Sequence, residues 1–308
     1  MRRTLLFSGL AGVLICAPLT VAVARAEEPS ALPGQPGGDP APDTQQAADA
    51  LKRNRYKDAI ASAKKALQRD KRYAPAMLVM AKAYYALKKY ELATSIVELA
   101  KQLDPNNAEA YNILGFVALA RNDNGTAAAD FKKATELKPD YGNAWNSLAA
   151  QYLQQKNYDG ALEAAEKATS LIPYFDKAWM NLGSAHRGKG NYPEAEKAYR
   201  RALELNPNSA DVYFNLGILY LDAPKIGDLE LKARLQTAMT HLAKYKNLAG
   251  VRLAKDDPAD TYIDEARKGI EREDKRLQRL EKQKARDAAK KPAPTPAAGE
   301  EGGPEAPK

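Results

Sequence analysis

Small, apolar and polar positions recur through the middle of the chain with a fixed period of 34 residues. Two of the resulting columns contain only alanine and a third contains only proline: Ala59, Ala93, Ala127, Ala161 and Ala195; Ala66, Ala100, Ala134, Ala168 and Ala202; Pro105, Pro139, Pro173 and Pro207. A period between about 20 and 50 residues is the mark of a repeat architecture. The chain is therefore predicted to consist largely of copies of one small structural repeat.

Each repeat is predicted to hold two helices. A large residue opens the pattern, and Leu or Met and then Gly or Ala follow three and four positions later, as at Trp145, Leu148 and Ala149. Intervals of three, four and seven are helical intervals. In one repeat they predict a first helix over 144–155 and a second over 159–171. Proline then ends the second helix, because it cannot continue one.

The repeat at 176–209 carries the fullest pattern, formed by Trp179, Leu182, Gly183, Ala195, Tyr199, Ala202 and Pro207. It resembles the tetratricopeptide repeat (TPR), from which it departs at His186, where the family usually has tyrosine. The resemblance implies an all-α fold, a solenoid of helix-turn-helix repeats wound into a right-handed superhelix. It also implies that the first helices line a concave face that typically binds peptide segments of other proteins.

The repeat array is predicted to span 43–250. It begins with a degenerate repeat at 43–73, continues with full repeats at 74–107, 108–141, 142–175 and 176–209, and ends with a modified repeat at 210–250. In the last repeat the alanine expected at position 229 is Leu229, and the second-helix column resumes nine residues late with Ala238, Leu242 and Tyr245. An enlarged turn over 222–228 explains the shift, as a tolerated loop insertion or as a partner-specific feature.

A charged segment follows the array at 251–291, and one long helix is predicted over 258–291. Its heptad stripe, interrupted by Glu273, consists of Ile263, Ala266, Ile270, Leu277 and Leu280. Two interpretations are open: a cap whose first half packs on the last repeat, or a coiled-coil contact with another chain. The Pro-, Gly- and Ala-rich stretches at 27–42 and 292–308 are predicted to be a disordered linker and a disordered tail.

Residues 1–26 have the pattern of a secretory signal. Arg2 and Arg3 precede a mostly apolar run, and Ala24 and Ala26 supply the small residues required before cleavage. Cleavage after Ala26 is favoured over an uncleaved anchor and over lipidation at Cys16. The expected location is the bacterial periplasm, with outer-membrane association as a further option.

Composition argues against most kinds of chemistry. The formal charge of +8 falls to +5 when Arg2, Arg3 and Arg25 leave with the signal, and the only cysteine leaves with it too. The chain has two histidines, and neither has metal-ligand spacing. Catalytic and phosphate-binding motifs are missing from the sequence. We therefore expect no enzyme activity, catalytic residue, metal site, cofactor, small-molecule substrate or nucleic-acid partner, and at most a loose attraction to anionic envelope surfaces.

Function is then expected on the concave face. The first-helix positions outside the core columns predict a protein-binding groove formed by Lys82, Tyr85, Asn112, Phe116, Leu119, Asn146, Leu153, Met180, Arg187, Phe214, Ile218 and Leu221. Its apolar members are expected to be exposed and to mark an interaction site, unless a neighbouring helix or the C-terminal segment covers them. The Lys and Asn clamp that reads C-terminal carboxylates in one group of the family is missing at the matching positions.

The sequence therefore predicts a non-catalytic periplasmic scaffold that binds a segment of a partner protein within an envelope-associated machine. Secretion, pilus, motility, outer-membrane and polysaccharide assembly are the classes of machine considered. The alternative is an accessory subunit of a cell-wall or exopolysaccharide enzyme that contacts glycan directly, which requires exposed aromatic side chains in the groove.

Overall fold

The computed structural model describes residues 38–290 except 228 and 255, so the predicted leader at 1–26, most of the linker and the tail at 292–308 lie outside the described residues. The described residues form thirteen α-helices, one short 3-10 helix and no strand. They divide into two compact units, with unit 1 ending at Val212 and unit 2 beginning at Tyr213. None of the described helices is both long and apolar enough to cross a bilayer.

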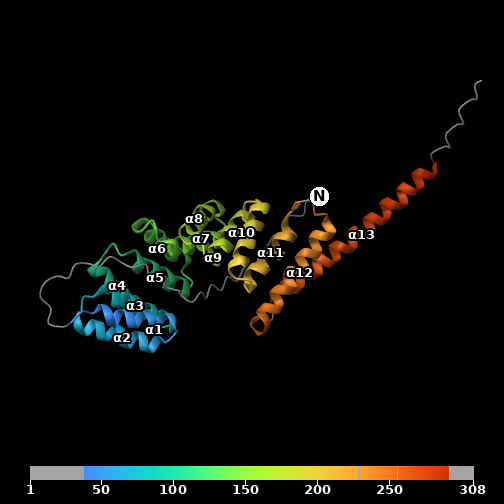
Figure 1. Ribbon diagram of the computed structural model, residues 1–308. Coiled ribbons are helices and arrows are strands. Elements are labelled where there is room, and N and C mark those ends of the chain that lie inside the picture. The colour runs from blue at the N-terminus through green and yellow to red at the C-terminus, as the bar shows by residue number, and fades with distance from the viewer. Residues whose placement is uncertain (1–37, 228, 255, 291–308) are drawn as a thin grey trace, which may run out of the picture. The chain divides into compact units, whose positions relative to one another are not determined.

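Unit 1 consists of five helix pairs, which follow one another from α1, drawn in blue, to α10, drawn in yellow (Figure 1). Each helix contacts its partner in the pair, and each second helix contacts the first helix of the next pair. The helices are α1 (Ala41–Lys52), α2 (Tyr56–Arg69), α3 (Ala74–Ala86), α4 (Tyr90–Leu103), α5 (Ala108–Ala120), α6 (Asn124–Leu137), α7 (Gly142–Gln154), α8 (Tyr158–Leu171), α9 (Asp176–Gly188) and α10 (Tyr192–Leu205). The all-α repeat fold predicted from the sequence is confirmed.

The turn inside each pair has one recurring geometry. A residue with positive φ follows the first helix at positions 34 residues apart: Asn54, Lys88, Asn122, Lys156 and Gly190. The N–H of the following residue then bonds to the carbonyl five residues earlier, as from Asp123 to Ala118 at 2.9 Å and from Asn157 to Tyr152 at 2.8 Å. This left-handed residue with its backward bond is a Schellman helix end, which satisfies carbonyls that the helix leaves unpaired.

The glycine and alanine columns allow a bulky side chain of the second helix to approach the first. A Cβ atom built on Gly183 lies 2.6 Å from two ring carbons of Tyr199, and one built on Gly115 lies 2.6 Å from the Phe131 ring. Both rings are fully buried. Trp145 and Trp179 donate their indole N–H to the carbonyls of Pro139 and Pro173, each at 2.8 Å. The proline that ends one helix pair thus also accepts a bond from the next.

Unit 2 contains most of α11 (Ala210–Asp222), then α12 (Leu231–Ala249), a 3-10 turn (Gly250–Arg252) and α13 (Ala259–Lys290). A Cβ on Gly217 lies 2.6 Å from Leu242, and Ala238 and Leu242 are fully buried, so the displaced column of the last repeat packs where it was predicted. Arg234 is buried and donates to the carbonyls of Tyr220 and Leu221 at 2.6 and 3.2 Å. It thereby caps the end of α11 after the enlarged turn.

Helix α13 packs on α12 through its first half only. Ala259 and Ala266 are buried, and a Cβ on Gly269 lies 2.7 Å from Leu235. Glu273 is the last buried side chain, and Arg276 on the next turn donates to both of its oxygens. The side chains of residues 275–287 are all exposed. Residues 259–274 therefore form the part of α13 that packs on α12, and unit 2 includes α12, α13 and most of α11.

Candidate protein-binding groove

The twelve predicted groove residues lie on first helices, but their exposure varies. In unit 1, α1 contacts α3, α3 contacts α5 and α7 contacts α9, and Ala118 of α5 shares a buried core group with Leu148 of α7, so the first helices form one side of the stack. We call this side the first-helix face; it contains Lys82, Tyr85, Asn112, Phe116, Leu119, Asn146, Leu153, Met180 and Arg187. Phe214, Ile218 and Leu221 lie on α11 in unit 2 and are described separately.

Polar side chains on this face connect neighbouring repeats. The Lys82 ammonium group forms an ion pair with Glu109, and Lys82 is only 4% exposed. Asn112, 1% exposed, donates to the Tyr141 hydroxyl at 3.3 Å. Lys82 and Asn112 thus stabilise the stacking of repeats, and they are too deeply buried to be the first contacts of a ligand.

One inter-repeat bond on this face also includes a half-buried residue. Asn181 on α9 donates to the Asn146 side-chain oxygen on α7 at 2.9 Å. Asn146 remains half-buried, whereas Asn181 is 5% exposed. Asn146 therefore still presents part of its amide to solvent while its orientation is fixed by the next repeat.

The aromatic residues of the face form a packed cluster. The rings of Tyr85 and Phe116 have centroids 6.1 Å apart, and Phe116 meets Phe131 of the second helix edge-on at 5.1 Å. Tyr85 also lies 5.8 Å from Tyr90. Phe116 and Leu119 pack against a buried core group that includes Phe131 and Leu148. Both are half-buried rather than exposed, which corrects the sequence-based expectation.

In unit 2 the three α11 residues are also covered. Ile218 is 8% exposed, and the Phe214 ring lies 5.0 Å from Tyr245 and 6.1 Å from Tyr262 on the helices that follow. Leu221 is half-buried. Ile218 is thus buried rather than exposed, and Phe214 packs on rings of the C-terminal helices, which agrees with the alternative that this segment covers the apolar residues.

The two histidines occupy packed positions. His186 on α9 is half-buried, and burial lowers the pKa of its imidazole below the usual range. His241 stacks on Tyr220 with centroids 5.5 Å apart. Met180 on the first-helix face is 8% exposed, so the side chains there that keep partial exposure are Tyr85, Phe116, Leu119, Asn146, Leu153 and Arg187. The sequence did not reveal Glu109, whose pairing with Lys82 spans 27 positions.

A carboxyl group away from this face has an unusual pKa. Asp130 lies on the second helix α6, and partial burial raises its pKa to about 6. The pKa of Asp130 is higher in the folded protein than in the unfolded chain. The free energy of unfolding therefore falls as pH rises from about 4 to 6, because the carboxylate is charged more readily in the unfolded chain. Asp130→Asn should therefore stabilise the protein at pH 7 by about 1 kcal/mol, after a discount for solvent screening.

The measurement for Asp130→Asn is urea denaturation at pH 7 and at pH 3.5. The difference from wild type should vanish at the lower pH, because both proteins then carry a neutral side chain at position 130. Asp140→Asn, at an exposed site, is the control and should change neither value. A gain that is the same at both pH values would contradict the assignment.

Known protein families match this chain over the same repeats. Tetratricopeptide repeat profiles match residues 50–115, 114–174, 176–209 and 198–239. The chain belongs to the tetratricopeptide-repeat family. Members of this TPR family are generally non-catalytic scaffolds that bind other proteins. No curated protein sequence matches this TPR chain significantly.

Solved structures support the TPR fold. The APC/C hetero-tetramer Cut9–Hcn1 aligns over 74% of this chain and 42% of that one, with a TM-score of 0.62 and 19% identity. Pseudomonas aeruginosa pilF aligns over 68% of this chain and 91% of that one, with a TM-score of 0.57 and 19% identity. The TPR chain thus spans less than half of the first of these structures, and at these identities the likeness concerns the fold.

Proposed function

We propose that this TPR protein is a non-catalytic scaffold of the bacterial periplasm. It binds a segment of a partner protein on the first-helix face, as part of an envelope-associated machine for secretion, pilus formation, motility, outer-membrane biogenesis or polysaccharide assembly. Family membership supports protein binding, and the leader pattern at 1–26 supports export. The central observation is the row of half-buried apolar and polar side chains along α5, α7 and α9.

The middle of the face suits a peptide better than a glycan. Glycan binding requires aromatic rings free to stack on sugars, whereas Tyr85 and Phe116 pack on each other and on the rings of α4 and α6. On α7, by contrast, Ala150 and Leu153 are half-buried one helical turn apart, next to the amide of Asn146. Small apolar contacts beside an oriented amide match an extended peptide segment, which has both apolar side chains and backbone groups to pair.

The test changes α7 without disturbing the core. Ala150→Glu combined with Leu153→Glu adds two negative charges to the face, and Ser170→Glu with Gln102→Glu adds the same charge at exposed second-helix sites. Each variant is expressed in the source bacterium, crosslinked in intact cells and purified. We expect a specific partner to be retained by wild type and by the control pair, and reduced at least about tenfold with the α7 pair.

Two further readouts make the outcome decisive. Circular dichroism must show equal helicity for all three proteins, so that a lost partner is not a lost fold. In the same cells, a mature chain that starts at Glu27 in the periplasmic fraction supports export, and a chain retained in the cytoplasm contradicts it. An unchanged partner set with the α7 pair would exclude this face as the binding site.

A further inference from the structure

The exposed side of α13 carries an ordered row of basic residues. Lysine and arginine alternate at intervals of four, three, four, three and four, forming what we call the basic stripe: Lys268, Arg272, Lys275, Arg279, Lys282 and Arg286. At about 100° per residue these six positions fall within an arc of roughly 80°, and at 1.5 Å per residue they extend over roughly 27 Å. All six side chains are exposed.

The stripe lies opposite the surface that holds α13 in place. Ala259, Ala266 and Glu273 are the buried positions of the helix, and they project from its other side. Among the described residues of unit 2, none of the six stripe cations pairs with a carboxylate: Arg276 pairs with Glu273, Arg267 with Asp264, and Lys232 with Asp274, all outside the stripe. Within unit 2, a flat anionic surface can therefore approach the whole row.

Charge is segregated by helix face although it alternates along the sequence. Between Lys268 and Arg286, all of which the structure describes, no acidic residue falls in the arc of the stripe. The acidic residues of this stretch lie on the flanks or on the packing side: Glu271, Glu273, Asp274 and Glu281. The stripe consequently acts as a row of like charges, which attracts anions more strongly than the mixed composition of the helix indicates.

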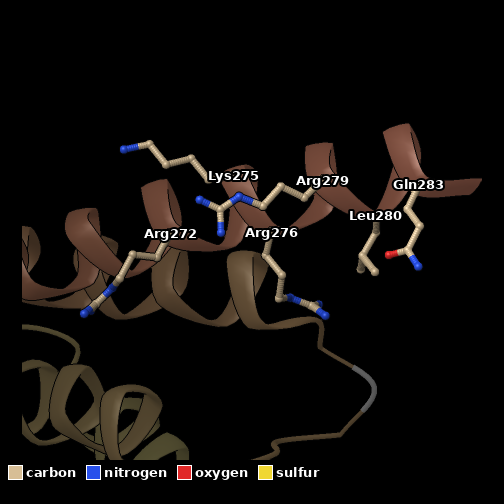
Figure 2. Close-up of a pocket in the computed structure, with 6 residues that line it drawn as sticks. All are labelled: Arg272, Lys275, Arg276, Arg279, Leu280 and Gln283. Atoms are coloured by element: carbon tan, nitrogen blue, oxygen red, sulfur yellow. The ribbon is translucent and has the colours of Figure 1, made fainter. Parts of the chain in front are cut away.

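A shallow hollow borders the stripe and combines charge with an apolar side chain. It has a volume of about 370 Å³ and is lined by Arg272, Lys275, Arg276, Arg279, Leu280 and Gln283 (Figure 2). Leu280 is 40% exposed, whereas Leu277, which is 41% exposed, lies on the side opposite the stripe. Arg276 already pairs with Glu273, so the free cations of the hollow are Arg272, Lys275 and Arg279, which suit the anionic phosphates of a phospholipid surface.

We propose that the basic stripe docks this protein on an anionic phospholipid bilayer surface, with headgroup phosphates along α13. The stripe contains no large apolar residue, so the helix lies on the surface without inserting. It also contains no aromatic residue on which nucleic-acid bases could stack, which disfavours single-stranded nucleic acid. The inference does not depend on the proposed partner binding, because the stripe is on α13 and the groove test changes α7.

Vesicle co-sedimentation tests this proposal. The chain from Glu27 onward is used, because the apolar leader would itself bind lipid, with vesicles of phosphatidylglycerol and phosphatidylcholine or of phosphatidylcholine alone. The stripe variant carries Lys275→Glu, Arg279→Glu and Lys282→Glu. The control variant carries Lys64→Glu, Lys132→Glu and Lys197→Glu, which make the same change in net charge at exposed sites of unit 1.

Wild type and the control variant should co-sediment with the anionic vesicles but not with the neutral ones. Binding to the anionic vesicles should weaken as the salt concentration is raised. The stripe variant should bind at least about tenfold more weakly, with unchanged helicity. Equal binding by the two variants, or no preference of wild type for anionic vesicles, would overturn the proposal. So would tighter binding of wild type to polyglutamate or duplex DNA at matched charge, since that would indicate an acidic protein or nucleic acid instead.

Discussion

Replacing Phe131 by alanine is expected to destabilise unit 1 by about 3–5 kcal/mol. The ring is fully buried on α6, where it contacts Phe116 and fills the space above Gly115. Alanine would leave a cavity that the two flanking helices cannot close without losing their own contacts. Urea denaturation followed by circular dichroism gives the loss, and hydrogen exchange should show it first in α5 and α6, because repeats depend on their neighbours.

Leu92→Ala is the matched control for Phe131→Ala. Leu92 lies on α4, a second helix of the same stack, but its side chain is 46% exposed. Removing it should change the free energy of unfolding by no more than about 0.5 kcal/mol. If Phe131→Ala and Leu92→Ala lowered the free energy of unfolding equally, the burial of Phe131 would not be what stabilises the repeat.

Gly183→Ala is expected to destabilise the protein by about 1–3 kcal/mol, although alanine ordinarily favours helix over glycine. The new methyl group would lie 2.6 Å from two ring carbons of Tyr199, and that ring is fully buried with its hydroxyl 3.0 Å from Ser184. Neither the ring nor the helix can move freely. Thermal and urea denaturation measure the effect.

Gly125→Ala provides the opposite expectation at a helical glycine. Its Cβ would meet only the Asp123 carboxylate, at 3.8 Å, so alanine there should be neutral or stabilise by about 0.5 kcal/mol. A second variant tests the cause: Tyr199→Leu removes the ring, so Gly183→Ala should cost at least about 1 kcal/mol less in that background. Additive losses would show that contact with Tyr199 is not the reason for glycine at 183.

The regular part of this fold is readable from the sequence because each column has one physical role. The alanine columns mark positions where helices contact closely, and the glycines lie where an aromatic ring packs against the helix. The proline ends a helix, and its carbonyl accepts a hydrogen bond from the tryptophan of the next repeat. Even the displaced column at Ala238 and Leu242 was predictable, since helical spacing resumes after the turn. Local periodicity alone is sufficient for these features.

The features that the sequence did not predict involve contacts between different repeats or the arrangement of residues around a helix. Lys82 looks like a solvated groove residue until Glu109, on the next first helix, is placed beside it. For Ile218 the sequence left open whether a C-terminal segment covers it, because the helices after α11 follow an irregular turn whose direction the sequence does not specify. The basic stripe was hidden because basic and acidic residues alternate along the chain, and only the helical arc separates them.

The five recurring turns offer fixed reference points along the array. They lie 34 positions apart, and the side chains at Asn54, Lys88, Asn122 and Lys156 are exposed beyond a helix end that backbone bonds close. The only cysteine of the chain, Cys16, is in the predicted leader. In a chain prepared from Glu27 onward, which lacks Cys16, cysteines placed at two of these turns would therefore be the unique pair available to spin labels or fluorophores. Distances between the two labels would measure how far the repeat array bends when it binds a ligand or a surface.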